Sequence, residues 1–132
     1  MTDEAIPPKV KRFISEYINS VELLEVLLLI RSAAKKEWSV DSISGELRSS
    51  PESVSKRLIY LCARGLVSRR DLPVPMYRYD PKREDLDMAI KGLAQAYAER
   101  RARVIDLIFS RPIDTLRNFS DAFKLRKDDE NG

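Results

Sequence analysis

The stretch SSPESVSKRLIYLCARGLVSRR, residues 49–70, decides the fold of this chain. Pro51 suits the first turn of a helix, where its missing N–H leaves no hydrogen bond unmade, and Ser49 with Glu52 can form a capping box. Gly65 supplies the left-handed residue that commonly ends a helix. Between these signals, apolar residues recur at helical spacing and predict a buried face made of Val54, Leu58 and Leu61. The pattern therefore predicts a helix that begins at Pro51 and ends just before Gly65.

A shorter helix precedes this one, and an extended ribbon follows it. Ser39 can cap the first helix, and the chain then turns at residues 48–50. Residues 66–70 and 76–79 have extended character, and the two prolines between them stiffen an exposed tip. Two helices joined by a short turn and followed by a hairpin form a winged helix-turn-helix. The predicted fold class is mainly α with a small β-hairpin, in which long N- and C-terminal helices flank the winged helix-turn-helix.

This part of the chain resembles the winged helix-turn-helix transcriptional regulators of bacteria, most nearly the MarR-like group. The resemblance lies in residues 49–58, in Leu61 and in residues 65–70, and it covers about a third of the chain. In that group the second helix lies in the major groove of DNA, and the hairpin touches the backbone or the minor groove. Such regulators often bind a small molecule between the dimer helices and the DNA-binding lobe. The resemblance therefore implies double-stranded DNA as a partner and a pocket for a small-molecule effector. The wing tip, residues 72–75, is more apolar than a typical DNA-contacting wing.

The charge of the whole chain is modest, but its distribution is uneven. With 24 basic and 21 acidic residues, the formal net charge is +3. Between Arg48 and Arg78 there are seven basic and two acidic residues, so this segment alone carries 7 − 2 = +5. A surface that binds phosphates needs such an excess, because the release of condensed counterions supplies most non-specific affinity for DNA.

Seven residues of this segment are predicted to contact DNA. They are Ser50, Ser53, Lys56, Arg57, Arg69, Arg70 and Arg78. Ser53 and Arg57 lie on the first turns of the second helix and are predicted to read bases, since an arginine paired bidentately with guanine contributes about 1–3 kcal/mol of discrimination. Lys56 is predicted to bind a phosphate, and Ser50 to act as a cap or a backbone contact. The alternative for these residues is an ordinary polar helix face.

The three arginines of the ribbon cannot all make the same contact. Alternate side chains of a strand point to opposite faces, so Arg69 and Arg70 should face different ways. At least one of the three is predicted to meet a phosphate. The alternative for each is a surface ion pair with Asp71, Asp80 or Glu46.

The C-terminal third is predicted to hold one long helix over residues 82–110, about 40 Å in length, and a final helix capped by Asp114. Two arrangements of these helices are open. They can fold back onto the N-terminal helix of the same chain, or they can pair with a second copy. We favour a homodimer that binds a palindromic site. Its predicted interface consists of Leu93, Tyr97, Val104, Ile108, Phe119 and Phe123.

The domain organisation follows from these elements, with Ser20 as the cap of a central apolar helix. We predict four regions: residues 1–19 as an arm and short helix, 20–81 as the winged helix-turn-helix DNA-binding domain, 82–126 as C-terminal helices for dimerisation, and 127–132 as a disordered tail.

Enzymatic chemistry has little support in this sequence. It contains no histidine, no glycine-rich phosphate loop and a single cysteine, Cys62, so we expect no catalytic site, no cofactor and no metal. One cysteine excludes an intramolecular disulfide and fits a reducing cytoplasm. The apolar residues 21–30 are too few to span a bilayer and are interrupted by Glu22 and Glu25. The predicted function is a sequence-specific DNA-binding transcriptional regulator of the bacterial cytoplasm. The alternative is a winged-helix adaptor that binds proteins and has no specific affinity for DNA.

Overall fold

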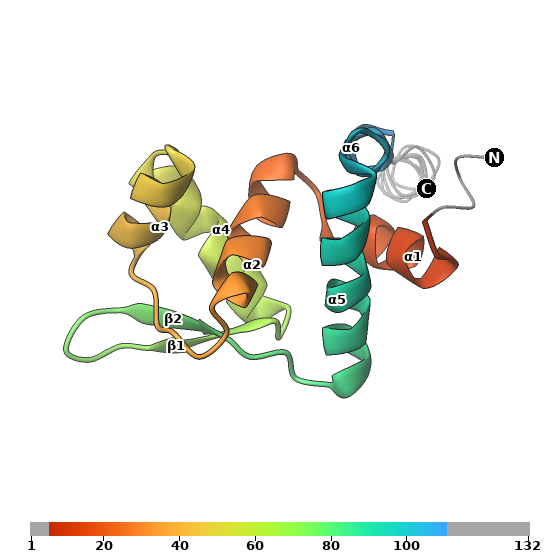
Figure 1. The fold of residues 1–132 in the computed structure, drawn as a ribbon. Coiled ribbons are helices and arrows are strands. Elements are labelled where there is room, and N and C mark those ends of the chain that lie inside the picture. Colours follow the sequence, from red (N-terminus) through yellow and green to blue (C-terminus); the bar gives the residue numbers. More distant parts are fainter. Residues whose placement is uncertain (1–5, 111–132) are drawn as a thin grey trace, which may run out of the picture.

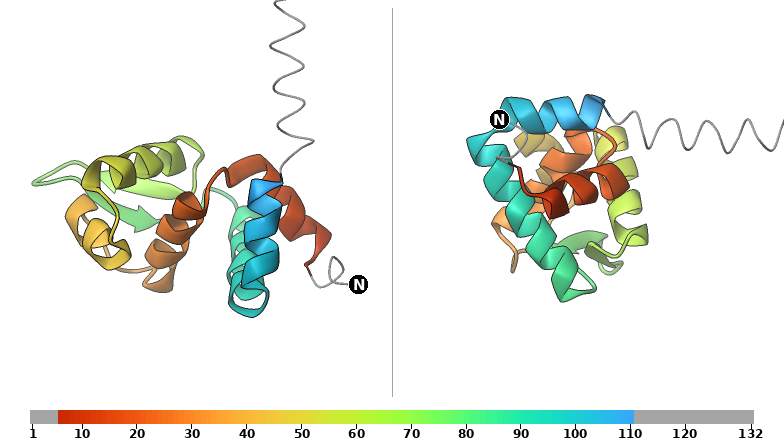
Figure 2. Two further views of the ribbon diagram at one scale, coloured as in Figure 1. Left: turned by 90° about the horizontal axis from the view of Figure 1, so that it is seen from above. Right: turned by 90° about the vertical axis from the view of Figure 1, so that its right-hand side faces the viewer.

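The structure is a computed structural model that describes residues 6–110 as six helices and one two-stranded sheet (Figure 1). In chain order the elements are α1 (Pro8–Tyr17), α2 (Val21–Ser32), α3 (Val40–Leu47), α4 (Pro51–Ala63), β1 (Val67–Arg70), β2 (Met76–Tyr79), α5 (Glu84–Glu99) and α6 (Arg101–Phe109). Figure 2 shows α3, α4 and the hairpin on one side of α2, and α1, α5 and α6 on the other. The predicted fold class, mainly helical with a small hairpin, is confirmed.

The central position of α2 follows from its composition. Its N-cap is Ser20, as predicted, with an Oγ that accepts a hydrogen bond from the N–H of Leu23 at 3.1 Å. Five side chains of this helix have no measurable exposure: Leu23, Leu24, Val26, Leu27 and Ile30. A helix that is apolar around most of its circumference has to be covered by neighbours, and α2 contacts α3, α4 and β2. Helix α2 therefore packs against the inner side of the helix-turn-helix, α3 and α4.

The first helix of the helix-turn-helix begins where the sequence predicts it. Ser39 and Ser42 form a capping box, in which each side-chain oxygen accepts from the other residue's N–H at 3.0 Å. The helix ends at Leu47, and its C-cap residue Arg48 adopts a left-handed conformation with φ of 57°. Arg48 therefore holds a conformation that is usually left to glycine or asparagine.

The second helix, α4, begins at Pro51 as predicted, but its cap differs from the predicted one. Ser50 is the N-cap residue, and its Oγ accepts a hydrogen bond from the N–H of Ser53 at 3.1 Å. The expected capping box of Ser49 and Glu52 is therefore wrong by one residue. The helix ends at Ala63, and Gly65 follows with φ of 77°, the left-handed position that its lack of a Cβ allows.

The predicted hairpin of two extended segments is confirmed. Strands β1 and β2 are antiparallel, with Val67 opposite Tyr79 and Arg70 opposite Met76. Trp38 adds a single bridge, because its N–H and C=O both pair with the backbone of Tyr77 at 2.7 Å. The tip, residues 71–75, is exposed throughout.

The predicted long helix over residues 82–110 is wrong. The helix is interrupted at Arg100, whose backbone dihedral angles, φ of −136° and ψ of 52°, are not helical. The break lets α6 lie across the end of α5 and pack on α1 (Figure 1). Two apolar side chains of α6, Val104 and Ile108, are thereby buried within the chain itself. At 1.5 Å per residue, α5 extends only about 24 Å, which is shorter than the helix of about 40 Å that the sequence predicts.

Helix α1 packs closely on α5 at a position that requires glycine. A Cβ added to Gly92 would lie 2.9 Å from Cγ2 of Val10, which is closer than real contacts allow. The buried apolar cluster of residues 6–110 includes side chains from α1, α2, α4, α5 and α6. The predicted boundaries of the four regions stay predictions. Within residues 6–110 no helix is both long enough and apolar enough to cross a membrane.

Two sequence predictions fall on segments that lie outside the described residues. They are the final helix that begins near Asp114, with Phe119 and Phe123, and the tail from residue 127 to 132. The predicted N-terminal arm falls outside the described residues as far as residue 5.

Candidate nucleic-acid interface

The outward face of α4 is the part of the winged helix-turn-helix on which the sequence predicts contacts with DNA. The helix buries Val54, Leu58 and Leu61 against the core, as predicted. Its most exposed side chains, on the opposite face, are Glu52, Lys56, Ile59 and Ala63. Lys56 forms no ion pair with any of residues 6–110 and therefore carries an available positive charge. Ile59 is 58% exposed, so the same face also has an apolar element.

Ser53 and Arg57, which were predicted to read bases, lie on a flank of α4 that faces α2. Both donate to the carboxylate of Glu22 in the first turn of α2: Ser53 through its Oγ and Arg57 through its Nε at 2.8 Å. The side chains of Arg57 and Glu22 are 32% and 23% exposed. The structure thus brings the two predicted residues together, but around an acidic group rather than on the outward face.

Glu22 is held as an anion by its neighbours. Burial opposes its ionisation, but hydrogen bonds from Ser53, Arg57 and Ser49 outweigh that effect and hold the pKa of Glu22 below its ordinary value. Its place in the first turn of α2 adds the favourable field of the helix N-terminus. Sequence reasoning missed this residue as part of the site, because it lies 35 positions before Arg57 in the chain.

The low pKa of Glu22 predicts how stability depends on pH. Because the folded pKa lies below the unfolded value of 4.5, the carboxylate stabilises the fold fully above pH 4.5 and loses that effect as the pH falls through the folded pKa. Urea unfolding at about pH 7 and about pH 3 should therefore show a larger loss of stability in the wild type than in Glu22→Gln. Equal losses in the two proteins would mean that the carboxylate makes no net contribution.

Two further side chains of the same flank attach α4 to α1. The Tyr60 hydroxyl donates to the carbonyl oxygen of Tyr17 at 3.0 Å. Arg64 lies over the Tyr17 ring, 4.1 Å from its centroid, and donates to the Tyr60 hydroxyl at 2.8 Å and to the Glu16 carbonyl oxygen at 3.1 Å. Tyr60 therefore packs against α1. Arg64 serves the fold rather than the outward surface.

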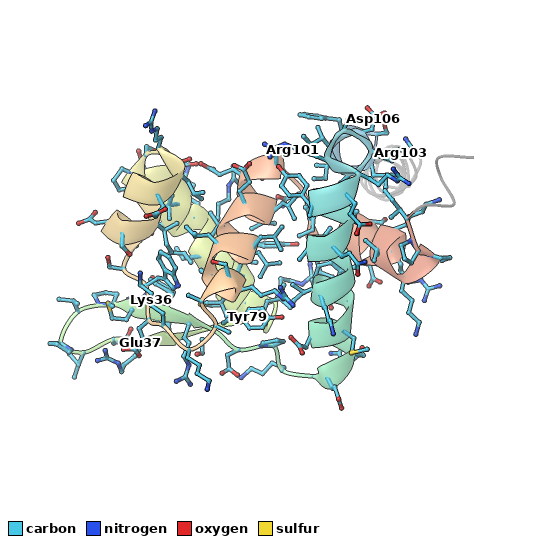
Figure 3. The ribbon with its side chains drawn as sticks, viewed as in Figure 1. Lys36, Glu37, Tyr79, Arg101, Arg103 and Asp106 are labelled. Atoms are coloured by element: carbon cyan, nitrogen blue, oxygen red, sulfur yellow. The ribbon has the colours of Figure 1, made fainter. Side chains whose placement is uncertain are left out.

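The hairpin arginines lie on opposite faces, as the alternation of a strand predicts. Arg69 is opposite Tyr77 in the ladder and forms an ion pair with Asp71 at 2.5 Å. Arg70 makes a two-point contact with Glu37, with Nε to Oε2 at 2.9 Å and Nη2 to Oε1 at 2.6 Å. Figure 3 shows Glu37 beside the hairpin, in the segment that joins α2 to α3.

The sequence left open whether the hairpin arginines form surface ion pairs. In the structure Arg69 and Arg70 do so. Asp71 was one of the three acidic partners considered for them, whereas Glu37 was not. Both pairs are largely exposed, and ion pairs in water are weak and easily exchanged. Arg78 is exposed and forms no ion pair within residues 6–110. Arg48, at the turn before α4, is likewise exposed and has no ion-pair partner in that range.

The predicted dimerisation residues that the structure describes belong largely to the chain's own core. Leu93, Val104 and Ile108 are at most 5% exposed, and they are covered by elements of the same chain. Tyr97 is partly buried, and its hydroxyl donates to Glu25 of α2 at 3.1 Å. These four side chains therefore pack within one chain, which is the first of the two arrangements that the sequence left open. Phe119 and Phe123 lie outside the described residues.

Tyr79 connects the base of the hairpin to α5. Its hydroxyl donates to Asp87 at 2.6 Å, and burial together with this hydrogen bond raises the pKa of Tyr79 far above its ordinary value. Figure 3 shows Tyr79 between the hairpin and the first half of α5. The hairpin is thus attached at its base to the other half of the molecule, whereas its tip is free in solvent.

A pocket of about 540 Å³ lies between α1 and the first half of α5. Its apolar lining includes Val10, Phe13, Leu86 and Ala89, and its charged lining includes Arg12 and Arg83. Tyr17 also lines the pocket, and the guanidinium group of Arg64 lies over its ring. Arg64 is the C-cap residue of α4. A volume of this size is within the usual range for small-molecule sites.

Comparison with known proteins agrees with this geometry. No protein-family model and no curated protein sequence matches the chain. Among solved structures, the MarR family transcriptional regulator Sco5413 from Streptomyces coelicolor superposes with a TM-score of 0.55 and 17% identity, over 98% of this chain and 89% of that chain. The fold is the MarR-type winged helix.

Two other solved structures are similar to the MarR-type fold of this chain. The YusO protein from Bacillus subtilis has a TM-score of 0.53 and 15% identity, over 96% of this chain and 87% of its own. A cysteine-to-serine mutant of MarR from Escherichia coli has a TM-score of 0.50 and 15% identity, over 92% and 93% of the two chains. At such low identity the likeness concerns the fold.

Proposed function

We propose that the chain is a sequence-specific double-stranded DNA-binding transcriptional regulator of the bacterial cytoplasm that acts as a homodimer on a palindromic site. In this proposal α4 enters the major groove and the hairpin lies along the backbone. The observation that carries the proposal is the arrangement of α4 and the hairpin in a MarR-type fold, with the outward face of α4 uncovered.

Within the basic segment from Arg48 to Arg78, the exposed cations that form no ion pair within residues 6–110 are Arg48, Lys56 and Arg78. They lie at the turn before α4, on its outward face and on β2, which are the elements that contact DNA in the proposed complex. We assign phosphate contacts to these three residues. Arg69 and Arg70 are secondary phosphate contacts, because each must first leave its carboxylate. Ser50 remains a helix cap, and Ser53 and Arg57 reach bases only if Glu22 releases them.

The proposed homodimer interface keeps only part of the set of residues that the sequence predicts. Since Leu93, Val104 and Ile108 are covered within the chain, we propose that the second copy contacts the end of α6, where Phe109 is 78% exposed, and the residues that follow, including Phe119 and Phe123. A two-fold axis would place two α4 helices in successive major grooves when they are about 34–36 Å apart. A small-molecule effector would occupy the pocket between α1 and α5. Tyr17 lines this pocket and contacts Arg64 at the end of α4, so the two residues connect the pocket with α4.

Salt titration against a mixed-sequence duplex tests DNA binding without knowledge of the operator. Three phosphate contacts in each of two protomers give about six contacts, so the logarithm of the binding constant should fall with the logarithm of salt concentration with a slope of about −5. Affinity should therefore drop by about a thousandfold between 50 and 200 mM salt. Fluorescence anisotropy with a labelled duplex of about 20 base pairs measures this directly.

A winged-helix adaptor for proteins is the second candidate, and specific exposed residues favour it. Leu72 and Val74 at the hairpin tip are 76% and 54% exposed, and Ile59 lies on the outward face of α4. Such apolar side chains suit a protein partner better than a phosphate backbone. An adaptor should show little binding to the duplex at any salt concentration, and that outcome would overturn the proposed regulator.

A further inference from the structure

We infer that Glu22 is a specificity-determining residue that occupies Ser53 and Arg57 in the free protein and suppresses non-specific binding to DNA. This inference rests on the proposed DNA-binding function and assigns a role to an acidic residue of α2 within it. In the free chain, the carboxylate takes the place that a phosphate or a base edge would take beside the flank of α4. DNA has to displace it before Arg57 is released.

The geometry supports competition because Glu22 receives the donors that DNA would need. Its carboxylate accepts from Ser53 and from Arg57, which lie on the first two turns of α4. A carboxylate and a phosphate are both anionic acceptors with the same preference for arginine and hydroxyl donors. The two anions therefore cannot share Arg57 without repulsion.

Glu22 differs in burial from the acidic partners of the hairpin arginines. The side chains of Arg57 and Glu22 are 32% and 23% exposed, whereas those of Arg69 and Asp71 are 44% and 73% exposed and those of Arg70 and Glu37 are 49% and 35% exposed. Water competes less for a partly buried pair, so the bond between Glu22 and Arg57 persists where the hairpin pair exchanges. While the pair is formed, Glu22 neutralises Arg57, and Arg57 does not attract a DNA phosphate. It becomes available only to a site whose bases bind it more strongly than Glu22 does.

The pair affects specificity through the free energy that counterion release contributes to DNA binding. Non-specific affinity grows with the number of phosphates that cations neutralise, and a neutralised Arg57 withholds one such contact from each protomer. Withholding it lowers the affinity for all sequences, whereas a site that binds Arg57 bidentately can still recover the energy of its release. Glu22 thereby widens the ratio between specific and non-specific binding.

The test compares the wild type with Glu22→Gln on the mixed-sequence duplex. Glutamine keeps an acceptor oxygen for Ser53 but removes the charge. Binding should tighten by about a hundredfold at about 50 mM salt, and the slope of the salt dependence should become steeper by about 0.9 for each protomer. Glu99→Gln is the matched control, because it removes the same charge from an exposed side chain of α5 that accepts a hydrogen bond from Gln95 at 3.4 Å. It should leave both quantities unchanged.

The double replacement Glu22→Gln with Arg57→Ala separates release of Arg57 from a general change of charge. If Glu22 acts by occupying Arg57, then Glu22→Gln should tighten binding much less when Arg57 is already absent. An equal gain in both backgrounds would contradict the inference, and so would weaker binding by Glu22→Gln, which would show that Glu22 positions Arg57 for DNA instead. Circular dichroism and urea unfolding of each variant confirm that the compared proteins are folded.

Failure of this inference can be told apart from failure of the proposed function. If the wild type binds the duplex with a steep salt dependence and Glu22→Gln does not tighten it, DNA binding stands and the role of Glu22 is overturned. If neither the wild type nor Glu22→Gln binds at about 50 mM salt, both the regulator and the inference are overturned.

Discussion

Replacing Leu58 with alanine is expected to lower the free energy of unfolding by about 2–5 kcal/mol. Leu58 has no measurable exposure and lies between Val54 and Leu61 on the inner face of α4. Alanine removes apolar contacts and leaves a cavity that the surrounding helices can fill only in part. Urea unfolding followed by circular dichroism measures the change, and the slope with denaturant should stay the same if only stability is affected.

Lys56→Ala provides the control on the opposite face of the same helix. Lys56 is exposed and forms no ion pair within residues 6–110, so its removal should change stability by less than about 0.5 kcal/mol. Its removal should instead weaken binding to mixed-sequence DNA and reduce the salt slope by about 0.9 for each protomer. If Leu58→Ala proved as mild as Lys56→Ala in unfolding, α4 would not be anchored by the face that we describe.

Replacing Gly92 with valine is expected to lower the free energy of unfolding by about 1–3 kcal/mol. The Cβ of any residue at this position would lie 2.9 Å from Cγ2 of Val10, which is 3% exposed and has little freedom to move. A β-branched side chain adds two more groups at the same place, so α1 has to move away from α5. Thermal or urea unfolding measures the loss.

Gly45→Val is the matched control for Gly92→Val. Gly45 is also a helical glycine, but a Cβ there would have nothing within 4 Å. Valine should therefore be neutral or slightly stabilising at this position, because it has a higher helix propensity than glycine. A comparable loss from both replacements would mean that backbone freedom, rather than the approach of α1 to α5, explains the cost at Gly92.

Local signals in the sequence were sufficient for most of the fold. Ser20 and Ser39 cap the helices that follow them, Pro51 begins α4, and Gly65 ends that region with positive φ. These features depend on residues within a few positions of each other, so they can be predicted without knowledge of distant contacts. The wrong capping box at Ser49 shows the limit of such signals, because consecutive serines offer two caps and only the backbone geometry chooses between them.

The break at Arg100 could not be read from local pattern. Residues 82–110 contain no proline, and their apolar side chains repeat at helical spacing on both sides of the break. A straight helix would carry Val104 and Ile108 away from α1, whereas the break lets α6 cover α1 and bury both side chains. Burial of apolar surface against a partner distant in sequence thus outweighs the cost of interrupting the helix.

The sequence by itself determined the order of the helices, the hairpin and the inner face of α4, because helical and extended periods are properties of neighbouring residues. Only the tertiary structure decided what the polar flank of α4 meets. A helical period shows that Ser53 and Arg57 share a flank, but it cannot show that α2 brings Glu22 against it. Whether a basic residue is an available charge or half of an ion pair depends on the packing of helices, and packing brings together residues that are far apart in the chain.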